Sequence, residues 1–283
     1  MGLFSVSYPI MWCSLELSLM VCLLYFMEKD SRVSVVFYYY IVQIISSMFM
    51  IVGIMVSEGV LVEFSFAVKI GLFPMFGWVI SVMWGLGLGL SVWLLLFTQK
   101  MIPFVLMARL GWLVEMGDGL LMSVILMSMI VGSVFMCIGE DLKWILVMSS
   151  LVHTSWVTYI LMGLPGSFMY YFILYGVVLG LVLVGDKDSS WNSWIYLLVI
   201  MSSVPPMVGF LLKFYSLSEM SSWVVVFVVV GVGTAVMVVV GYFISLVKFC
   251  VVGKMGGEGL GGSVKAVVVL VLMMVVGCYG VLI

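Results

Sequence analysis

Glu16, Lys69, Lys100 and Lys213 lie inside segments that otherwise have the composition of membrane-spanning helices. Only 8 % of the 283 residues are charged, so these charges stand out from their surroundings. A charge at the centre of a bilayer costs about 2.5–3.5 kcal/mol on insertion scales, and packing or pairing must offset that cost. A single lysine near a helix end can extend its ammonium group to the lipid headgroups. Together, the four residues predict an ion path through the membrane.

His153 is a further candidate, because Ser149, Ser150, Thr154 and Ser155 surround it in the sequence. The ordinary pKa of imidazole lies near neutrality, which suits a proton relay. The alternative is a neutral histidine that packs against a neighbouring helix and hydrogen-bonds to it. The sequence contains no Ser/His/Asp or Cys/His set, no paired catalytic carboxylates and no metal-ligand cluster. We therefore expect no chemistry on an organic substrate, no cofactor-binding residues and no metal site in this chain.

The composition excludes several other classes of protein. The five cysteines lie in apolar segments without CxxC spacing, which argues against a disulfide framework or a metal cluster. The formal net charge of −2 and the lack of a basic stripe exclude a nucleic-acid partner. The glycines between Gly253 and Gly262 neither follow a strand nor precede a phosphate-binding helix, so they are only a weak candidate for nucleotide binding.

The elements that hold the charged residues are predicted to be transmembrane helices. Hydrophobic residues make up 65 % of the chain, and its mean hydropathy is +1.38. A bilayer core needs about 20 apolar residues per helix, so the chain accommodates about ten spans. We place these spans at residues 3–27, 33–56, 60–82, 86–107, 120–138, 142–163, 167–184, 192–214, 222–249 and 264–283. The expected fold is all-α: one polytopic membrane bundle over residues 1–283 without a soluble domain.

The loops and the first segment indicate how the bundle lies in the membrane. The first segment lacks a basic start and a cleavage site, so we expect it to be retained as a helix. The odd-numbered connections carry most of the loop cations, and the positive-inside rule places them in the cytoplasm or the mitochondrial matrix. These cations are Lys29, Arg32, Lys143, Lys187, Lys254 and Lys265, against Arg109 in the even-numbered connections.

Prolines interrupt three of the predicted spans close to their lysines. Pro74 removes a backbone donor and clashes with the carbonyl of Ile70, next to Lys69. Pro103 stands in the same relation to Gln99, next to Lys100. The Pro205–Gly209 stretch breaks a third span before Lys213. Broken helices at membrane depth are tolerated where protein or a water-filled cavity satisfies the exposed backbone, and such breaks commonly form transport sites.

Five segments are similar to the motifs of a known protein family. Lys69–Trp78 is similar to KLGxAPFHFW, and Leu94–Pro103 is similar to LLLTWQKLAP. The other three matches are Ser14–Leu17 to part of GLEMN, Lys143–His153 to KILAYSSxxH, and Pro205–Lys213 to PPLTGFLPK. In this order, over roughly residues 11–220, the segments resemble those of the NADH:ubiquinone oxidoreductase chain 2 family, antiporter-like membrane-arm subunits of mitochondrial respiratory complex I.

The resemblance implies a role in proton translocation coupled to electron transfer from NADH to ubiquinone. It implies that Glu16 pairs with Lys69, that Lys100 is the central proton site and that Lys213 leads towards the exit. His153 matches a polar residue of the hydrated axis between them. The partners implied are other membrane-arm subunits and lipids of the mitochondrial inner membrane, not further copies of this chain. NADH, FMN, iron–sulfur clusters and ubiquinone are expected in those other subunits.

The chain departs from the family pattern at three places. Histidine is usual in the family at the position of Phe76 or Gly77, and proline at the position of Ile80. The chain also begins shortly before Glu16, so we expect one N-terminal helix of the usual animal form to be absent.

Two other functions remain open from the sequence. A stand-alone cation/proton antiporter would also need buried lysines and broken helices. Na⁺ prefers oxygen ligands, however, and the buried residues singled out above are three lysines and one glutamate, which favours protons. A purely structural membrane subunit would need no aligned charges.

Overall fold

The computed structural model describes residues 8–29, 32–87, 89–110, 118–139, 141–163, 168–184, 213 and 224–255. Within these ranges the chain is helical, with no strand. The helices are α1 (Tyr8–Glu28), α2 (Val33–Val56), α3 (Gly59–Ile70), α4 (Gly77–Gly85), α5 (Leu90–Trp93), the π-helical η2 (Leu94–Thr98), α6 (Gln99–Arg109), α8 (Asp118–Ile138), α9 (Leu142–Gly163), α10 (Phe168–Val184) and α13 (Val224–Met255).

The described helices confirm an all-α multi-pass membrane fold. Among the described residues, six helical segments are long and apolar enough to cross a bilayer. The predicted spans 33–56 and 142–163 coincide with α2 and α9. Two predicted spans lie outside the described residues: 264–283 entirely, and 192–214 except for Lys213. Residues 1–7 of the predicted single domain also lie outside them.

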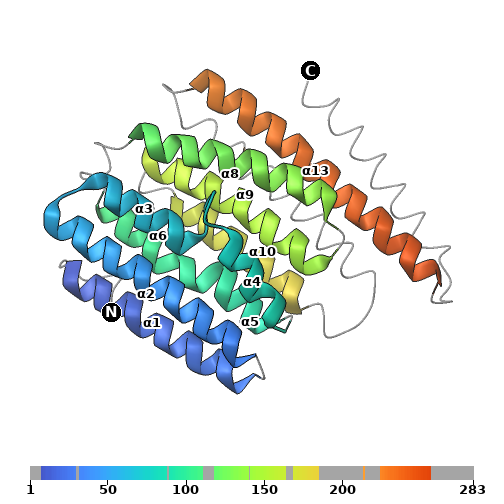
Figure 1. Cartoon of the computed structure of the whole chain (residues 1–283). Coiled ribbons are helices and arrows are strands. Elements are labelled where there is room, and N and C mark those ends of the chain that lie inside the picture. The colour runs from blue at the N-terminus through green and yellow to red at the C-terminus, as the bar shows by residue number, and fades with distance from the viewer. Residues whose placement is uncertain are drawn as a thin grey trace.

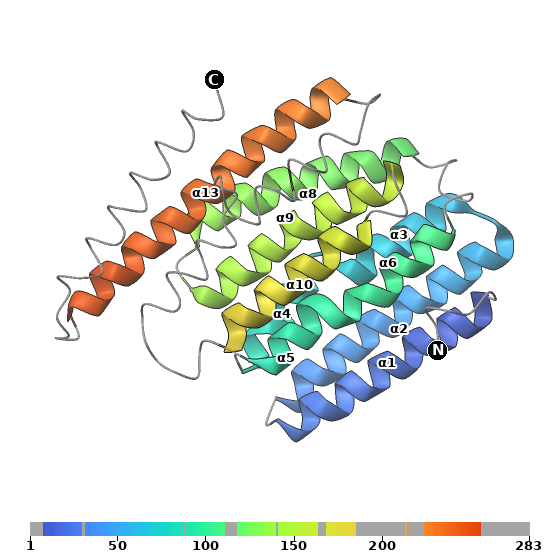
Figure 2. The same cartoon turned by 180° about the vertical axis from the view of Figure 1, so that it is seen from behind.

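The helices run roughly alongside one another, with α9 near the middle of the bundle (Figures 1 and 2). Every residue of α9 from Ile145 to Leu161 is buried. Outer helices instead expose large apolar side chains, for example Leu17 on α1 and Met55 on α2. This distribution suits a bundle in lipid, because apolar side chains facing hydrocarbon carry no hydration cost.

The break at Pro74 is confirmed. Helix α3 ends at Ile70, residues 71–76 are not helical, and α4 begins at Gly77. Gly71 closes α3 with a φ of 77°, a left-handed conformation that glycine adopts without steric cost. The expected break at Pro205 lies outside the described residues.

The discontinuity near Pro103 differs from the expected one. Pro103 lies within α6, and the helix continues through it to Arg109. The irregular turn is instead the π-helical segment η2, which ends at Thr98, directly before Gln99 and Lys100. Single π turns recur in helices at functional sites. Unlike a break at proline, a π turn is not marked by a particular residue type in the sequence.

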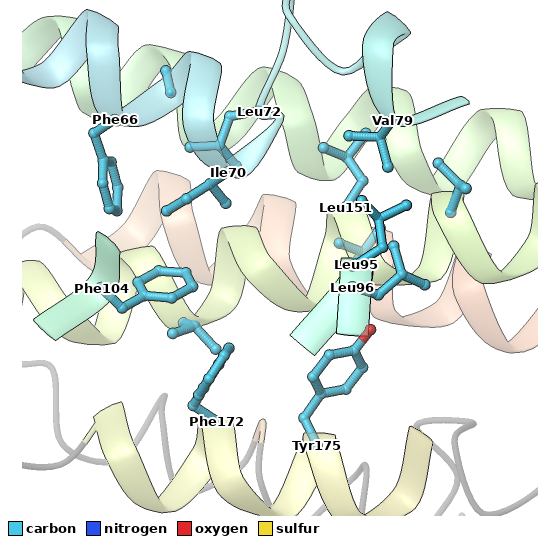
Figure 3. Close-up of a cluster of buried hydrophobic side chains, with 14 of the residues drawn as sticks. Phe66, Ile70, Leu72, Val79, Leu95, Leu96, Phe104, Leu151, Phe172 and Tyr175 are labelled. Atoms are coloured by element: carbon cyan, nitrogen blue, oxygen red, sulfur yellow. The ribbon is translucent and has the colours of Figure 1, made fainter. Parts of the chain in front are cut away.

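Close packing between the α5–η2 segment and α10 depends on a glycine. A methyl group added at Gly176 would overlap the ring of Phe97. The indole of Trp93 donates a hydrogen bond to the Gly176 carbonyl at 2.9 Å, and Phe97 stacks on Phe172 with 4.7 Å between ring centroids. Small residues at such contacts let transmembrane helices approach closely. The same packing layer continues into the apolar core around Leu95, Leu96 and Leu151 (Figure 3).

We expect Gly176→Ala to destabilise the protein by about 1–3 kcal/mol, because the added methyl group overpacks the contact with Phe97. Gly233→Ala in α13 is the matched control, since an added Cβ there meets nothing within 4 Å. The measurement is the melting temperature of the detergent-solubilised protein, together with its amount in membranes. Equal melting temperatures for the two variants would contradict the packing argument.

Candidate functional site

Lys69 lies at the broken end of α3 and exposes only 3 % of its surface. Its ammonium group donates a hydrogen bond to the backbone carbonyl of Gln43 in α2 at 3.3 Å. The side-chain amide of Gln43 in turn donates to the Lys69 carbonyl at 3.4 Å. The two residues therefore join α2 to the break through reciprocal hydrogen bonds.

The other carbonyls at the break are also satisfied within the protein. The indole of Trp78, from the first turn of α4, donates to the Val68 carbonyl at 2.8 Å. The amides of Gly71 and Leu72 both donate to the Ala67 carbonyl, at 3.0 and 2.9 Å. An unsatisfied carbonyl in hydrocarbon costs several kcal/mol, so these bonds are what allow a helix to end at this depth.

Glu16 does not form a direct salt bridge with Lys69 in the structure. The Oε1 atom of Glu16 is buried and has no hydrogen-bond partner among the described residues. Glu16 nevertheless lies close enough for its charge to act on Lys69 through space. The expected approach to within about 4–6 Å, or through a bridging water, remains a prediction.

Lys100 follows the π turn η2 directly and exposes 3 % of its surface. Its neighbour Gln99 donates a hydrogen bond to the carbonyl of Ser18 in α1 at 3.2 Å. Helix α1, which carries Glu16, is thereby tied to the segment that carries Lys100. Glu16, Lys69 and Lys100 thus belong to one group of packed helices, α1, α2, α3 and α6.

His153 belongs to a second group, formed by α8, α9, α10 and α13. Its Nδ1 lies 3.0 Å from the hydroxyl of Tyr171, and its ring stacks on Tyr175 with 4.7 Å between centroids. All three side chains are almost completely buried. Its Nε2 and the Tyr175 hydroxyl have no hydrogen-bond partner among the described residues. His153 therefore makes the hydrogen bond expected of a packed histidine while keeping one ring nitrogen available.

Lys213 lies in the same group and is also buried. Its ammonium group is 5.9 Å from the ring centroid of Trp156, which is within cation–π range. Trp156 is one turn after His153 on α9, and the charge of Lys213 acts on His153. The structure thus brings Lys213 and His153 together, while Lys69 and Lys100 lie in the first group. Contacts of α4 and α6 with α9 connect the two groups.

A buried charge that the sequence analysis missed is Glu63. It lies within α3, and its side chain is completely buried. Its position inside the predicted span 60–82 was the available signal. With Glu63 added, the charged residues singled out inside apolar segments become three lysines and two glutamates, which weakens the count that favoured protons over Na⁺. No group of three or more His, Cys, Asp and Glu side chains that could hold a metal ion occurs among the described residues.

Comparison with curated proteins finds similar sequences. The chain is 30 % identical over 260 residues to NADH-ubiquinone oxidoreductase chain 2 of Mytilus edulis, covering 83 % of this chain and 77 % of that protein. It is 27 % identical over 242 residues to the protein of the same name from Albinaria caerulea, covering 79 % and 76 %. A scan against protein-family models finds no match.

Solved structures share the fold. A chain of respiratory complex I from Thermus thermophilus matches with a TM-score of 0.57 and 16 % identity, over 77 % of this chain and 58 % of that one. A chain of the Mrp complex from a Dietzia species matches with a TM-score of 0.58 and 14 % identity, over 77 % and 49 %. The present chain therefore spans about half the length of these solved chains, and the likeness concerns the fold alone.

The hydrogen bond between the Tyr171 hydroxyl and Nδ1 should set the tautomer of His153, because a partner on one ring nitrogen decides which nitrogen carries the proton. We expect Tyr171→Phe to shift the ¹⁵N resonance of Nδ1 and the tautomer ratio. Tyr175→Phe is the matched control, since its hydroxyl has no partner among the described residues and its ring is retained. The measurement is solid-state NMR of the purified chain with ¹⁵N-labelled histidine, of which the chain contains one. Identical spectra for wild type and Tyr171→Phe would rule out this control of the tautomer.

Proposed function

The chain belongs to the NADH-ubiquinone oxidoreductase chain 2 family, and we propose that it is a membrane-arm subunit of respiratory complex I that takes part in proton translocation. Its place is the mitochondrial inner membrane, together with other membrane-arm subunits and lipids. NADH oxidation and ubiquinone reduction take place in other subunits, which hold the FMN, the iron–sulfur clusters and the quinone. This chain contributes the path of the proton and no redox chemistry.

The observation that carries the proposal is Lys69 at the end of a broken, internally satisfied helix. An ammonium group in low dielectric is held charged only by nearby partners, so its protonation responds to small movements of those partners. Lys69 hydrogen-bonds to a backbone carbonyl and senses Glu16 without contacting it directly. This arrangement suits a charge switch, because the Glu16–Lys69 separation can change without breaking a salt bridge.

Lys100 is the next group on the proposed path. A change in the separation of Glu16 and Lys69 changes the electric field at Lys100, and this field influences whether Lys100 holds or releases its proton. Gln99 bonds α1 to the turn before Lys100, so a shift of α1 would also act there mechanically. The π turn of η2 is the adjustable element in this segment.

His153 and Lys213 form the second half of the proposed path. The hydroxyls of Ser149, Ser150 and Thr154 lie around His153 on α9 and donate to carbonyls of their own helix. Each hydroxyl oxygen can still accept a hydrogen bond, so these residues can support a file of water molecules between the lysines. The proton would then pass by way of His153 to Lys213.

We expect Lys100→Met to reduce proton pumping and coupled NADH:ubiquinone turnover of the assembled complex by roughly tenfold or more, since a group that exchanges protons is removed. Electron transfer from NADH to an artificial acceptor should remain unchanged, because that step lies in other subunits. Lys29→Met is the control, since Lys29 is an exposed cation near the end of α1. Full coupled turnover in Lys100→Met would show a tolerated buried charge that is not part of the path.

The alternative is a stand-alone cation/proton antiporter. In addition to Glu16, the chain has the buried carboxylate of Glu63, and carboxylate oxygens are ligands that cations prefer, so this alternative has more support than the sequence count suggested. We expect the chain, purified gently through an affinity tag, to remain in a large complex with flavin and iron–sulfur absorbance. Purification as an isolated oligomer with cation/proton exchange activity in vesicles would instead support the antiporter.

A further inference from the structure

Glu63 is the fifth residue of α3, and its side chain has no exposed surface. A carboxylate enclosed at this depth is costly, and within membrane segments such residues are functional by default. The proposed path above does not use Glu63. Two geometric relations, one to α6 and one to the membrane surface, indicate what it does.

The first relation is to α6. Phe66 lies one turn after Glu63 and packs edge-to-face against Phe104 of α6, with 5.6 Å between ring centroids and an angle of 80° between the ring planes (Figure 3). Glu63 therefore shares the α3 face that looks towards α6. Lys100 lies one turn before Phe104, on the corresponding face of α6. Glu63 and Lys100 consequently belong to the same helix interface.

The two helices run in opposite directions, because α4 continues onward from α3 and the α5–η2–α6 segment returns beside it (Figures 1 and 2). Lys100 thus lies level with the broken end of α3, and Glu63 lies level with the last turns of α6. Along α3, Glu63 is about 9 Å from Lys69 and about 6 Å from the first residue, Gly59. Glu63 is therefore a buried charge that lies between the depth of Lys69 and Lys100 and the membrane surface at the start of α3.

That surface is opposite the end that carries most of the loop cations, although Arg109 lies at the end of α6. The end of α1, the start of α2 and the start of α9 lie at the other end of the bundle (Figure 1). The cations in or beside these parts of the chain are Lys29, Arg32 and Lys143. Lys143 donates a hydrogen bond to the Leu86 carbonyl there, at 2.6 Å. By the positive-inside rule, the cationic end faces the matrix. The Gly59 end, and with it Glu63, faces the opposite compartment.

An apolar barrier separates Glu63 from Lys100. Phe66 and Phe104 are both completely buried, and Phe104 continues the layer to Phe172 of α10 at 5.2 Å between centroids (Figure 3). Aromatic constrictions of this kind block proton transfer while dry and permit it when water enters. Glu63 on one side and Lys100 on the other therefore flank the apolar Phe66–Phe104 layer.

We infer that Glu63 is the proton-exchanging carboxylate on the outer side of the Phe66–Phe104 layer, receiving protons from the Lys100 side and releasing them at the Gly59 end. This inference rests on the proposed function. When water crosses the layer, an N–H bond breaks on the lysine side and an O–H bond forms on Glu63. In the second step the Glu63 O–H bond breaks and the proton passes to water on the outer side.

The test uses Glu63→Gln in the assembled complex, which removes the proton-exchanging group and keeps the shape of the side chain. We expect coupled turnover and proton pumping to fall roughly tenfold or more, with unchanged electron transfer from NADH to an artificial acceptor. Glu58→Gln is the matched control, because Glu58 is an exposed carboxylate five residues earlier, at the start of α3. Wild-type pumping in Glu63→Gln would overturn the inference.

A second measurement does not depend on activity or on the assembly of the variant. Dicyclohexylcarbodiimide, an apolar reagent, modifies carboxyl groups that take up a proton in a lipid environment. We expect mass spectrometry of the wild-type complex to find the adduct on Glu63. Absence of the adduct under conditions that modify other intramembrane carboxyls would show a permanently ionised structural group and would refute the inference.

The two hypotheses fail in different ways. If Lys100→Met pumps normally, the proposed function of the lysine path is wrong. If Lys100→Met loses pumping but Glu63→Gln retains it, only the inference about Glu63 is wrong. Loss of pumping in both variants, with labelling of Glu63, supports both.

Discussion

The structure depends on one constraint, which is that the hydrocarbon interior of a membrane offers no water to a broken helix. Ending α3 at Ile70 frees backbone carbonyls at membrane depth, and each of three neighbours takes one. Trp78 reaches back from α4 to Val68, Gln43 reaches across from α2 to Lys69, and the turn at Gly71 closes onto Ala67. The break and its surroundings therefore form one unit, and Lys69 is held by the same residue that satisfies its backbone.

This constraint also explains why the polar groups gather in two places. One group surrounds the break and the π turn, and the other lies where α9 packs against α10 and meets α13 through Trp156 and Phe227. Between them lie apolar side chains such as Leu95, Leu96 and Leu151 (Figure 3). Charges in such surroundings interact over longer distances than they do in water, so the two groups need not touch to influence each other.

The fold was predictable where local composition determines it. Long apolar runs predicted α2 and α9 with the bounds that the structure has. The backbone donor that Pro74 lacks predicted the break after α3. The sequence did not predict the π turn before Lys100, because a single extra residue in a turn leaves no compositional signal. It also did not predict that Gln43 would be the partner of Lys69 or Tyr171 that of His153, because those contacts join separate helices and depend on tertiary packing. Glu63 is a different case, since its charge is visible inside a predicted span, but no proline lies near it to indicate a site.

A ribosome delivers transmembrane helices to the bilayer in chain order, so α9 must enter before α10 and α13 are available to cover it. Helix α9 is rich in hydroxyl groups, which would be expensive in lipid if they depended on later helices for partners. They do not: Ser149, Ser150, Thr154, Ser155 and Thr158 each donate to a carbonyl within α9 itself. His153 differs, because the partner of its Nδ1 is Tyr171 of a later helix, α10. The hydroxyl groups of α9 are thus satisfied within the helix itself during synthesis, and Nδ1 of His153 gains its partner when α10 arrives.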